Sequence, residues 1–273
     1  MKNNKYRHMK LLVVEGNNRE TRLERGAFGI KPYYQIFSEM LNEIVPYAEI
    51  DVAFPADDEK ILPSITKLKA YDGVLWTGSS LSVLDLIPTV TQQLNFAENI
   101  FKSGVPFYGS CWGLQVATVV AGGSVAKSNN GLELDLSNPI QLTREGKKSP
   151  LFKGRENNYR ALCIHYDEVS EVPENTTVLA YNSHSKVQAM TFEYLNATFF
   201  GVQYHPEFSP IVMAQIISFL KEKLIESNYF SSEAEVEKEI TKLKNPAILP
   251  KEIANYKLHT QEISSWIQYI SKN

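Results

Sequence analysis

Residues 104–121 constrain the fold more than any other stretch of this sequence. A short apolar run reaches Gly109, Cys111 follows two residues later, and an apolar helical pattern begins after Gly113. A strand, a sharp turn and a helix with a nucleophile at the turn form a nucleophile elbow, where small residues let strand and helix approach closely. The helix N-terminus favours a thiolate and holds an anion. We therefore predict that Cys111 is a catalytic thiolate; the alternative is a buried structural cysteine.

The composition is that of a soluble globular protein. With 273 residues, of which 43% are hydrophobic and 22% charged, the chain is long enough for one large α/β domain or two small ones. A net charge of −3 gives no reason to expect nucleic acid or a membrane surface as a partner. Cys111 and Cys163 suggest no disulfide framework, and no apolar run suits a signal peptide or a bilayer span. We expect a cytoplasmic protein.

The first half of the chain alternates between strand and helix patterns up to residue 121. This alternation predicts a three-layer α/β fold, with a mostly parallel central sheet and helices on both faces. In such sheets the site lies at the carboxyl ends of the strands. The expected strands are residues 10–15, 49–54, 72–76 and 105–108, and the expected helices are residues 32–44, 57–70, 88–103 and 114–121.

The second half changes to short strands and ends in a charge-rich helical segment. We divide the chain into a loose tail of residues 1–9, a catalytic domain of residues 10–227 and a helical extension of residues 228–273. Apolar residues at helical spacing predict a last helix that packs on the domain or on a second copy in a homodimer; these residues are Ile263, Trp266, Ile267 and Ile270. The expected strands are residues 124–127, 139–143, 161–165, 177–180, 187–192 and 198–203, and a helix is expected over residues 210–226.

Residues 16–31 are polar and rich in charge, with Arg19, Arg22 and Arg25 among them. We expect a long loop at the carboxyl end of the first strand, and we predict that it shapes the mouth of the substrate site. A solvated surface loop is the alternative.

A cysteine nucleophile needs a base, and the base needs a partner that orients it. Of the five histidines, His205 directly follows the strand pattern at residues 198–203, so we expect it beside Cys111 at the carboxyl edge of the sheet. Glu207 can accept a hydrogen bond from its imidazole. We predict Cys111, His205 and Glu207 as nucleophile, base and orienting acid; the alternative for His205 is a purely structural histidine.

Acyl transfer also needs hydrogen-bond donors for the oxyanion of the tetrahedral intermediate. The backbone N–H of Trp112, directly after the nucleophile, is one candidate. Residues 77–80, Thr-Gly-Ser-Ser, follow the third strand pattern and offer a second through Gly78 and Ser79. An ordinary strand-to-helix loop is the alternative there.

Two motifs resemble those of the class I, or triad, glutamine amidotransferases, and most of all the glutaminase domain of GMP synthase and its stand-alone relatives. Residues 109–115 read Gly-Ser-Cys-Trp-Gly-Leu-Gln and fit G-x-C-x-G-x-Q. Residues 201–207 read Gly-Val-Gln-Tyr-His-Pro-Glu and fit G-x-Q-x-H-P-E. The order of the motifs fits as well, and the resemblance covers about residues 10–225.

Two further segments resemble the family less closely. Residues 165–169 are similar to its H-x-D-x-V segment, whose Asp binds the α-amino group of glutamine. Residues 77–80 take the place of its Ser-Gly-Gly-Pro oxyanion loop, with Ser79 and Ser80 where the family has glycine and proline.

The resemblance implies a flavodoxin-like α/β fold and hydrolysis of the γ-carboxamide of glutamine. Cys111 would attack the side-chain carbonyl, His205 would protonate the departing ammonia, and water would then hydrolyse the γ-glutamyl thioester. No cofactor is implied, and the histidines and cysteines lack the spacing of metal ligands. The residues expected to bind the substrate are Gln115, His165, Asp167 and Ser80.

The sequence lacks the phosphate loop of a GMP synthase ATP pyrophosphatase, so ammonia would pass to a separate synthetase subunit or simply be released. Three functions stay open. The first is a glutaminase, and the second is a γ-glutamyl peptide or γ-glutamyl amine hydrolase without an ammonia acceptor. The third is a catalytically silent regulatory or binding subunit, against which the intact Cys-His-Glu set argues.

Overall fold

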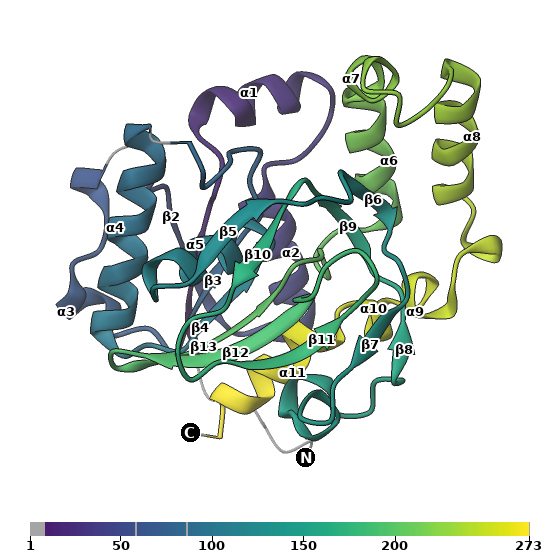
Figure 1. Cartoon of the computed structure of the whole chain (residues 1–273). Helices are drawn as coiled ribbons and strands as arrows, with labels where there is room; N and C mark the ends of the chain where they lie inside the picture. Colours follow the sequence, from purple (N-terminus) through teal and green to yellow (C-terminus); the bar gives the residue numbers. More distant parts are fainter. Residues whose placement is uncertain (1–8, 58, 86, 273) are drawn as a thin grey trace.

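A nine-stranded sheet runs through the computed structural model, which describes residues 9–57, 59–85 and 87–272 (Figure 1). Its first five strands in spatial order, from β2 (Glu49–Ala53) to β13 (Ala197–Val202), pair in parallel, and the other neighbours pair antiparallel. The fold class is confirmed, because a parallel core sheet carries helices on both faces. In spatial order the strands are β2 (Glu49–Ala53), β1 (Lys10–Val14), β3 (Gly73–Trp76), β4 (Phe107–Ser110), β13 (Ala197–Val202), β12 (Ala189–Tyr194), β11 (Thr177–Tyr181), β7 (Ile140–Leu142) and β8 (Asn158–Tyr159).

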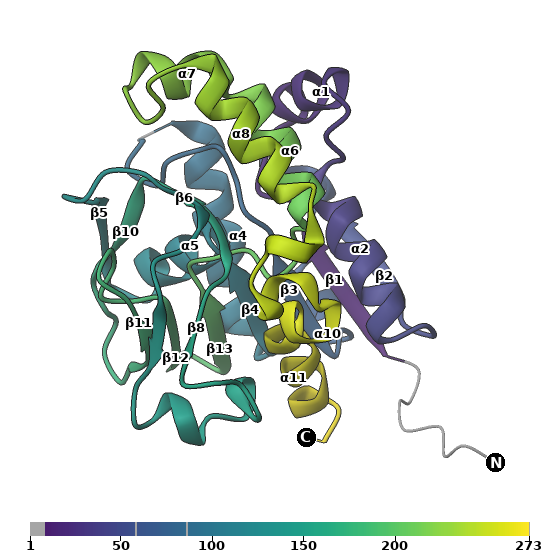
Figure 2. The same cartoon turned by 90° about the vertical axis from the view of Figure 1, so that its right-hand side faces the viewer.

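Helices cover both faces of the parallel strands, because successive residues of a strand point to opposite sides. Helices α2 (Tyr33–Ile44) and α11 (Gln261–Ile270) pack on one face, where Trp266 joins a buried cluster with Val13. On the other face lie α4 (Pro88–Ser103) and α5 (Trp112–Val120). Figure 2 shows α2 and α11 in front of the parallel strands and α4 and α5 behind them.

The remaining elements flank this core. Two small antiparallel sheets pair β5 (Ser124–Lys127) with β10 (Asp167–Glu171) and β6 (Glu133–Leu136) with β9 (Leu162–His165), and a third buried cluster joins α6 (Pro210–Phe219) and α8 (Glu233–Leu243). The remaining strands are β5 (Ser124–Lys127), β6 (Glu133–Leu136), β9 (Leu162–His165) and β10 (Asp167–Glu171); the remaining helices are α1 (Arg19–Ala27), α3 (Ile65–Leu68), α6 (Pro210–Phe219), α7 (Lys221–Glu226), α8 (Glu233–Leu243), α9 (Lys251–Ala254) and α10 (Tyr256–His259), with short 3₁₀ turns at Glu59–Ile61, Gly146–Lys148, Pro150–Phe152 and Pro246–Ile248.

The expectation of a long loop over residues 16–31 is wrong, because α1 forms there. The side chain of Asn18 caps this helix by accepting a hydrogen bond from the Thr21 N–H at 2.9 Å. An N-terminal cap of this kind satisfies a backbone donor that the helix leaves free. The helix is mostly polar, so it carries no apolar stripe that a sequence pattern could reveal.

Other boundaries also differ from the expectation. The helix expected over residues 57–70 shrinks to a 3₁₀ turn and α3, because Pro63 stands between them and Ser64 caps α3; residue 58 lies outside the described residues. The helix expected over residues 210–226 divides at Leu220 into α6 and α7. Of the expected tail, Met9 is buried, and residues 1–8 lie outside the described part.

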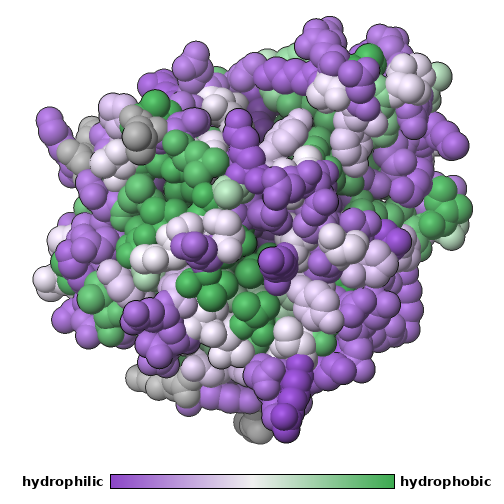
Figure 3. Space-filling view, viewed as in Figure 1, coloured by the Kyte–Doolittle hydropathy of each residue, from purple (hydrophilic) through white to green (hydrophobic). Residues whose placement is uncertain are grey.

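The last helix packs on its own chain. Ile263 and Trp266 of α11 are buried against the sheet, with no more than 1% of either residue exposed. Figure 3 shows one face of the molecule, where hydrophobic side chains gather left of centre and hydrophilic side chains cover most of the rest. Within the described residues, no helix combines the length and apolar character needed to cross a membrane.

Candidate active site

Cys111 stands at the expected elbow between β4 and α5. Its φ of 49° and ψ of −97° are unusual for a residue other than glycine. The turn is held by its backbone N–H, which donates to the Val202 carbonyl at 2.8 Å. Space for the turn comes from glycines, since a Cβ at Gly109 would lie 2.5 Å from the carbonyl carbon of Gly113. The local sequence therefore holds the thiol at the N-terminus of a helix.

His205 follows β13, the strand next to β4, and lies beside Cys111. Its Nδ1 is 2.7 Å from Oε1 of Glu207, and both side chains are buried. Among the described residues, its Nε2 has no hydrogen-bond partner. Burial alone would lower the pKa of His205, but the charges of Glu207 and Cys111 outweigh burial and raise this pKa to about 10. At neutral pH the ring is therefore a proton donor next to the thiol.

Two further contacts fix the imidazole ring. Phe208 stacks on it with the ring centroids 4.0 Å apart and the planes 3° from parallel. A Cβ at Gly78 would lie only 2.6 Å from Cε1 of His205, so glycine is needed at that position. The residues expected as base and oxyanion donor are thus in direct contact.

The segment at residues 77–80 directly follows β3, the strand next to β4 in the sheet. Among the described residues, no acceptor contacts the backbone N–H of Ser79 or that of Trp112. The Ser79 hydroxyl donates to the Gly16 carbonyl at 3.0 Å. Asn17 Oδ1 accepts from the backbone N–H and from the hydroxyl of Ser80, each at 2.9 Å. These hydrogen bonds hold residues 77–80 in place. The backbone N–H groups of Ser79 and Trp112 stay free to donate to an anion.

The expected substrate-binding residues gather around Asp167, at the start of β10. Gln115 Nε2 donates to the Asp167 carbonyl at 3.0 Å, and His165 Nδ1 lies 3.2 Å from the same oxygen. One Asp167 carboxylate oxygen accepts from the Ser82 hydroxyl at 2.5 Å. Ser80 instead donates its hydroxyl to Asn17 and accepts a hydrogen bond from Arg25 of α1, so this hydroxyl is already engaged by protein groups.

Behind His165 lies a buried polar cluster with Glu133 and His184, a set of ligand types that could hold a metal ion. His165 Nε2 is 3.0 Å from Oε2 of Glu133, and Gln188 donates to the same oxygen at 2.9 Å. The other carboxylate oxygen accepts from the Asn138 N–H and from Asn182, each at 2.8 Å. Hydrogen bonds thus account for this buried carboxylate without an ion.

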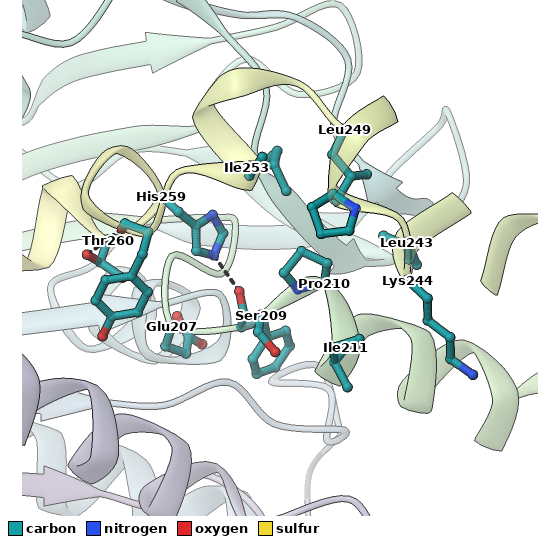
Figure 4. A pocket seen from close by; sticks show the side chains of 14 residues that line it. Glu207, Ser209, Pro210, Ile211, Leu243, Lys244, Leu249, Ile253, His259 and Thr260 are labelled. Carbon is teal, nitrogen blue, oxygen red and sulfur yellow. Dashed lines mark hydrogen bonds between the residues drawn. The ribbon is translucent and has the colours of Figure 1, made fainter. Parts of the chain in front are cut away.

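A residue near the C-terminus also contacts this part of the chain. His259 of α10 contacts the backbone carbonyl of Phe208 through Nε2. Burial lowers the pKa of His259 to about 4, so the neutral ring donates this hydrogen bond at neutral pH. Figure 4 shows this bond at a cavity of about 220 Å³, whose lining includes Glu207.

The sequence does not predict a role in the site for several of these residues. Phe208 directly follows the His-Pro-Glu motif, so its position next to the motif was a usable signal. Asn17, at the end of the first strand, carried a weaker one. Glu133 and His259 carried none, because only the folded chain brings them to the site.

The family match agrees with this geometry. The family described as "Glutamine amidotransferase class-I" matches residues 33–224, and the chain belongs to this family. It is therefore a cysteine-based amide hydrolase.

Individual relatives and a solved structure add detail. The chain is 32% identical to a γ-glutamyl-L-1-hydroxyisopropylamide hydrolase of a Pseudomonas species, over 84% of this chain and 78% of the relative. It is 27% identical to γ-glutamyl peptidase 4 of Arabidopsis thaliana, over 68% of this chain and 71% of the relative. Its fold is similar to the crystal structure of a glutamine amidotransferase from Thermotoga maritima, with a TM-score of 0.70 and 18% identity over 98% of this chain and 100% of the other.

Proposed function

We propose that this protein hydrolyses the γ-amide bond of γ-glutamyl compounds, with Cys111, His205 and Glu207 as its catalytic triad. The observation that carries the proposal is the buried His205, whose Nδ1 meets Glu207 at 2.7 Å and whose Nε2 is free beside Cys111. A nucleophile, a base and an orienting acid in this order are what acyl transfer to a thiol needs.

The reaction follows from this arrangement in two halves. The Cys111 thiolate attacks the γ-carbonyl carbon, and the backbone N–H groups of Trp112 and Ser79 stabilise the oxyanion. His205 gives its proton to the departing nitrogen as the C–N bond breaks, which leaves a γ-glutamyl thioester on the sulfur. His205 then takes a proton from water, which attacks the thioester, and glutamate leaves as the thiolate forms again.

Asp167 is the residue that we propose for the glutamyl α-ammonium group. Its side chain is mostly buried, and the Gln115 amide and the His165 ring hold its backbone carbonyl in place. A carboxylate so fixed loses little conformational freedom when it binds an ammonium group.

The relatives favour γ-glutamyl amines or peptides as substrates, since two of them are named for hydrolysis of γ-glutamyl compounds. The second candidate substrate is glutamine itself, which the family name favours. In that case the product is ammonia, and a separate synthetase subunit would be its acceptor.

Product release from purified protein tests the proposal. L-glutamine, γ-glutamyl amines and γ-glutamyl dipeptides are compared, with Cys111→Ala as the inactive variant. Cys163→Ala is the matched control, because burial raises the pKa of the Cys163 thiol well above its usual range and keeps it unreactive. Fast release from γ-glutamyl amines or dipeptides, lost only in Cys111→Ala, supports the hydrolase. Fast turnover of glutamine alone favours the second candidate, and activity that survives Cys111→Ala contradicts both.

A further inference from the structure

Arg25 of α1 is a buried cation without a counter-charge in the described part of the chain. Only 8% of this residue is exposed. Its guanidinium donates to the Tyr33 hydroxyl through Nη1 and to the Ser80 hydroxyl through Nη2, the latter at 3.1 Å. Both partners are uncharged, and Arg25 forms no ion pair with any described carboxylate. Burying an unpaired charge is costly, and an anion bound beside this guanidinium would offset that cost.

Other arginines of the chain show the contrast. Arg22 lies one turn earlier on the same helix and pairs with Asp57, with Nη2 at 2.5 Å from Oδ2. Arg155 is buried as well, and it pairs with the buried Glu262. Arg25 instead has the ring of Tyr33 as a neighbour, 5.0 Å from its guanidinium carbon. Arg25 therefore differs from Arg22 and Arg155 in having no acidic partner among the described residues.

Two aromatic rings, those of Tyr33 and Phe208, connect Arg25 to His205. The Tyr33 ring packs on Phe208 at 4.9 Å, and Phe208 stacks on His205. Burial raises the pKa of Tyr33, the charge of Arg25 lowers it, and Cys111 is among the groups whose charge acts on it. The proposed ligand of the α-ammonium group, Asp167, forms no hydrogen bond or ion pair with Arg25 and is held by other residues.

We propose that Arg25 binds a carboxylate on the leaving group, so that the preferred substrates are γ-glutamyl amino acids or peptides. This inference rests on the proposed function. The departing nitrogen lies next to His205, which protonates it, and an amino acid carries its carboxylate on the carbon bonded to that nitrogen. Within the described residues, two N–H groups of Arg25 have an acceptor, so further donors remain for the charge-assisted hydrogen bonds that a carboxylate accepts.

A pair of substrates that differ in one group tests the inference. γ-Glutamylalanine and γ-glutamylethylamide share the scissile bond, and only the first has a carboxylate on the leaving group. We expect the wild type to favour γ-glutamylalanine in kcat/KM by about tenfold or more, the usual effect of a charge-assisted hydrogen bond. Arg25→Met should abolish this preference by raising KM for γ-glutamylalanine more than KM for γ-glutamylethylamide. Arg25→Lys should keep part of the preference.

Arg22→Gln is the matched control on the same helix, and it should leave the ratio of the two kcat/KM values unchanged. The ratio is internal to each variant, so partial loss of folded enzyme does not alter it. Equal cleavage of both compounds by the wild type, or a preference that survives Arg25→Met, overturns the inference and leaves the proposed function standing. Cleavage of neither compound overturns the proposed function, and the inference with it.

Discussion

Two neighbours, Glu207 and Cys111, set the charge state of His205, because both raise the pKa of its imidazole. Burial would lower the pKa of this imidazole, and Glu207 and Cys111 together raise it to about 10. The ring thus carries a proton at neutral pH, which is the state needed to protonate a departing amine. Glu207 also fixes which nitrogen faces the thiol, because its carboxylate accepts a hydrogen bond from Nδ1.

Removal of the Glu207 charge should change both the rate and its pH dependence. Glu207→Gln keeps the shape of the side chain and lowers the pKa of His205. The upper limb of the pH profile of kcat/KM should therefore move to lower pH, because His205 loses its proton earlier as pH rises. We expect the maximal rate to fall by about 10²–10⁴-fold, as for other general acid–base groups. An upper limb that stays in place would show that His205 is not the group that titrates.

The sequence predicts Cys111 and His205 because each follows a strand closely, at the edge where parallel strands meet, and it predicts Glu207 because this acid lies beside His205 in the same short segment. Arg25 differs from the triad residues. We propose it as a ligand because its partners among the described residues are uncharged, and no sequence pattern indicates this. Gly78 touches His205 from a segment far away in the chain, whereas Phe208 directly follows the His-Pro-Glu motif. Contacts of this kind depend on the folded backbone.

Helix α10 reaches the catalytic base through one intermediate residue. His259 contacts the Phe208 carbonyl, and the Phe208 ring stacks on His205. We therefore expect His259 to be a positioning residue.

Substitution of His259 separates positioning from binding. His259→Leu removes the donor and leaves a buried carbonyl unpaired, at a cost of about 1–3 kcal/mol in the free energy of unfolding. We expect kcat to fall with KM nearly unchanged, and His259→Gln, which can still donate, to recover part of kcat. Steady-state kinetics and urea unfolding measure both effects. A stability loss with an unchanged kcat would limit His259 to a structural role.

At the level of elements, strongly patterned segments are predictable and weakly patterned ones are not. The expected helix over residues 88–103 coincides with α4, whose buried face has apolar residues at helical spacing. Helix α1 is missed because its stability comes from a side-chain cap and contacts of its arginines. The 3₁₀ turn and α3 replace a longer predicted helix because Pro63 interrupts the segment.

In the whole molecule, the C-terminal segment contributes to the same buried core as the parallel sheet. Trp266 is 1% exposed and lies 5.7 Å from Tyr108 of β4, measured between ring centroids. The sequence predicts the amphipathic helix, but only the structure shows which surface receives it. The choice depends on the shape of the sheet face, where a Cβ at Gly73 would lie 2.5 Å from the Trp266 ring.

Truncation of this side chain should destabilise the whole fold. We expect Trp266→Ala to lower the free energy of unfolding by about 3–5 kcal/mol, the usual range for a large buried aromatic residue. Ile248→Ala is the control in the same segment, since Ile248 is 60% exposed and should change stability by less than about 0.5 kcal/mol. Chemical denaturation checks both variants. Equal stability of Trp266→Ala and wild type would mean that α11 does not support the core.

The central claim is that a γ-glutamyl thioester forms on Cys111. Rapid acid quenching of the enzyme during turnover of γ-glutamylalanine, followed by peptide mass mapping, tests it most directly. We predict the added mass of one γ-glutamyl group on the peptide that contains Cys111, and no such mass in Cys111→Ala. Turnover without any adduct on Cys111, or an adduct on another residue, would contradict the account.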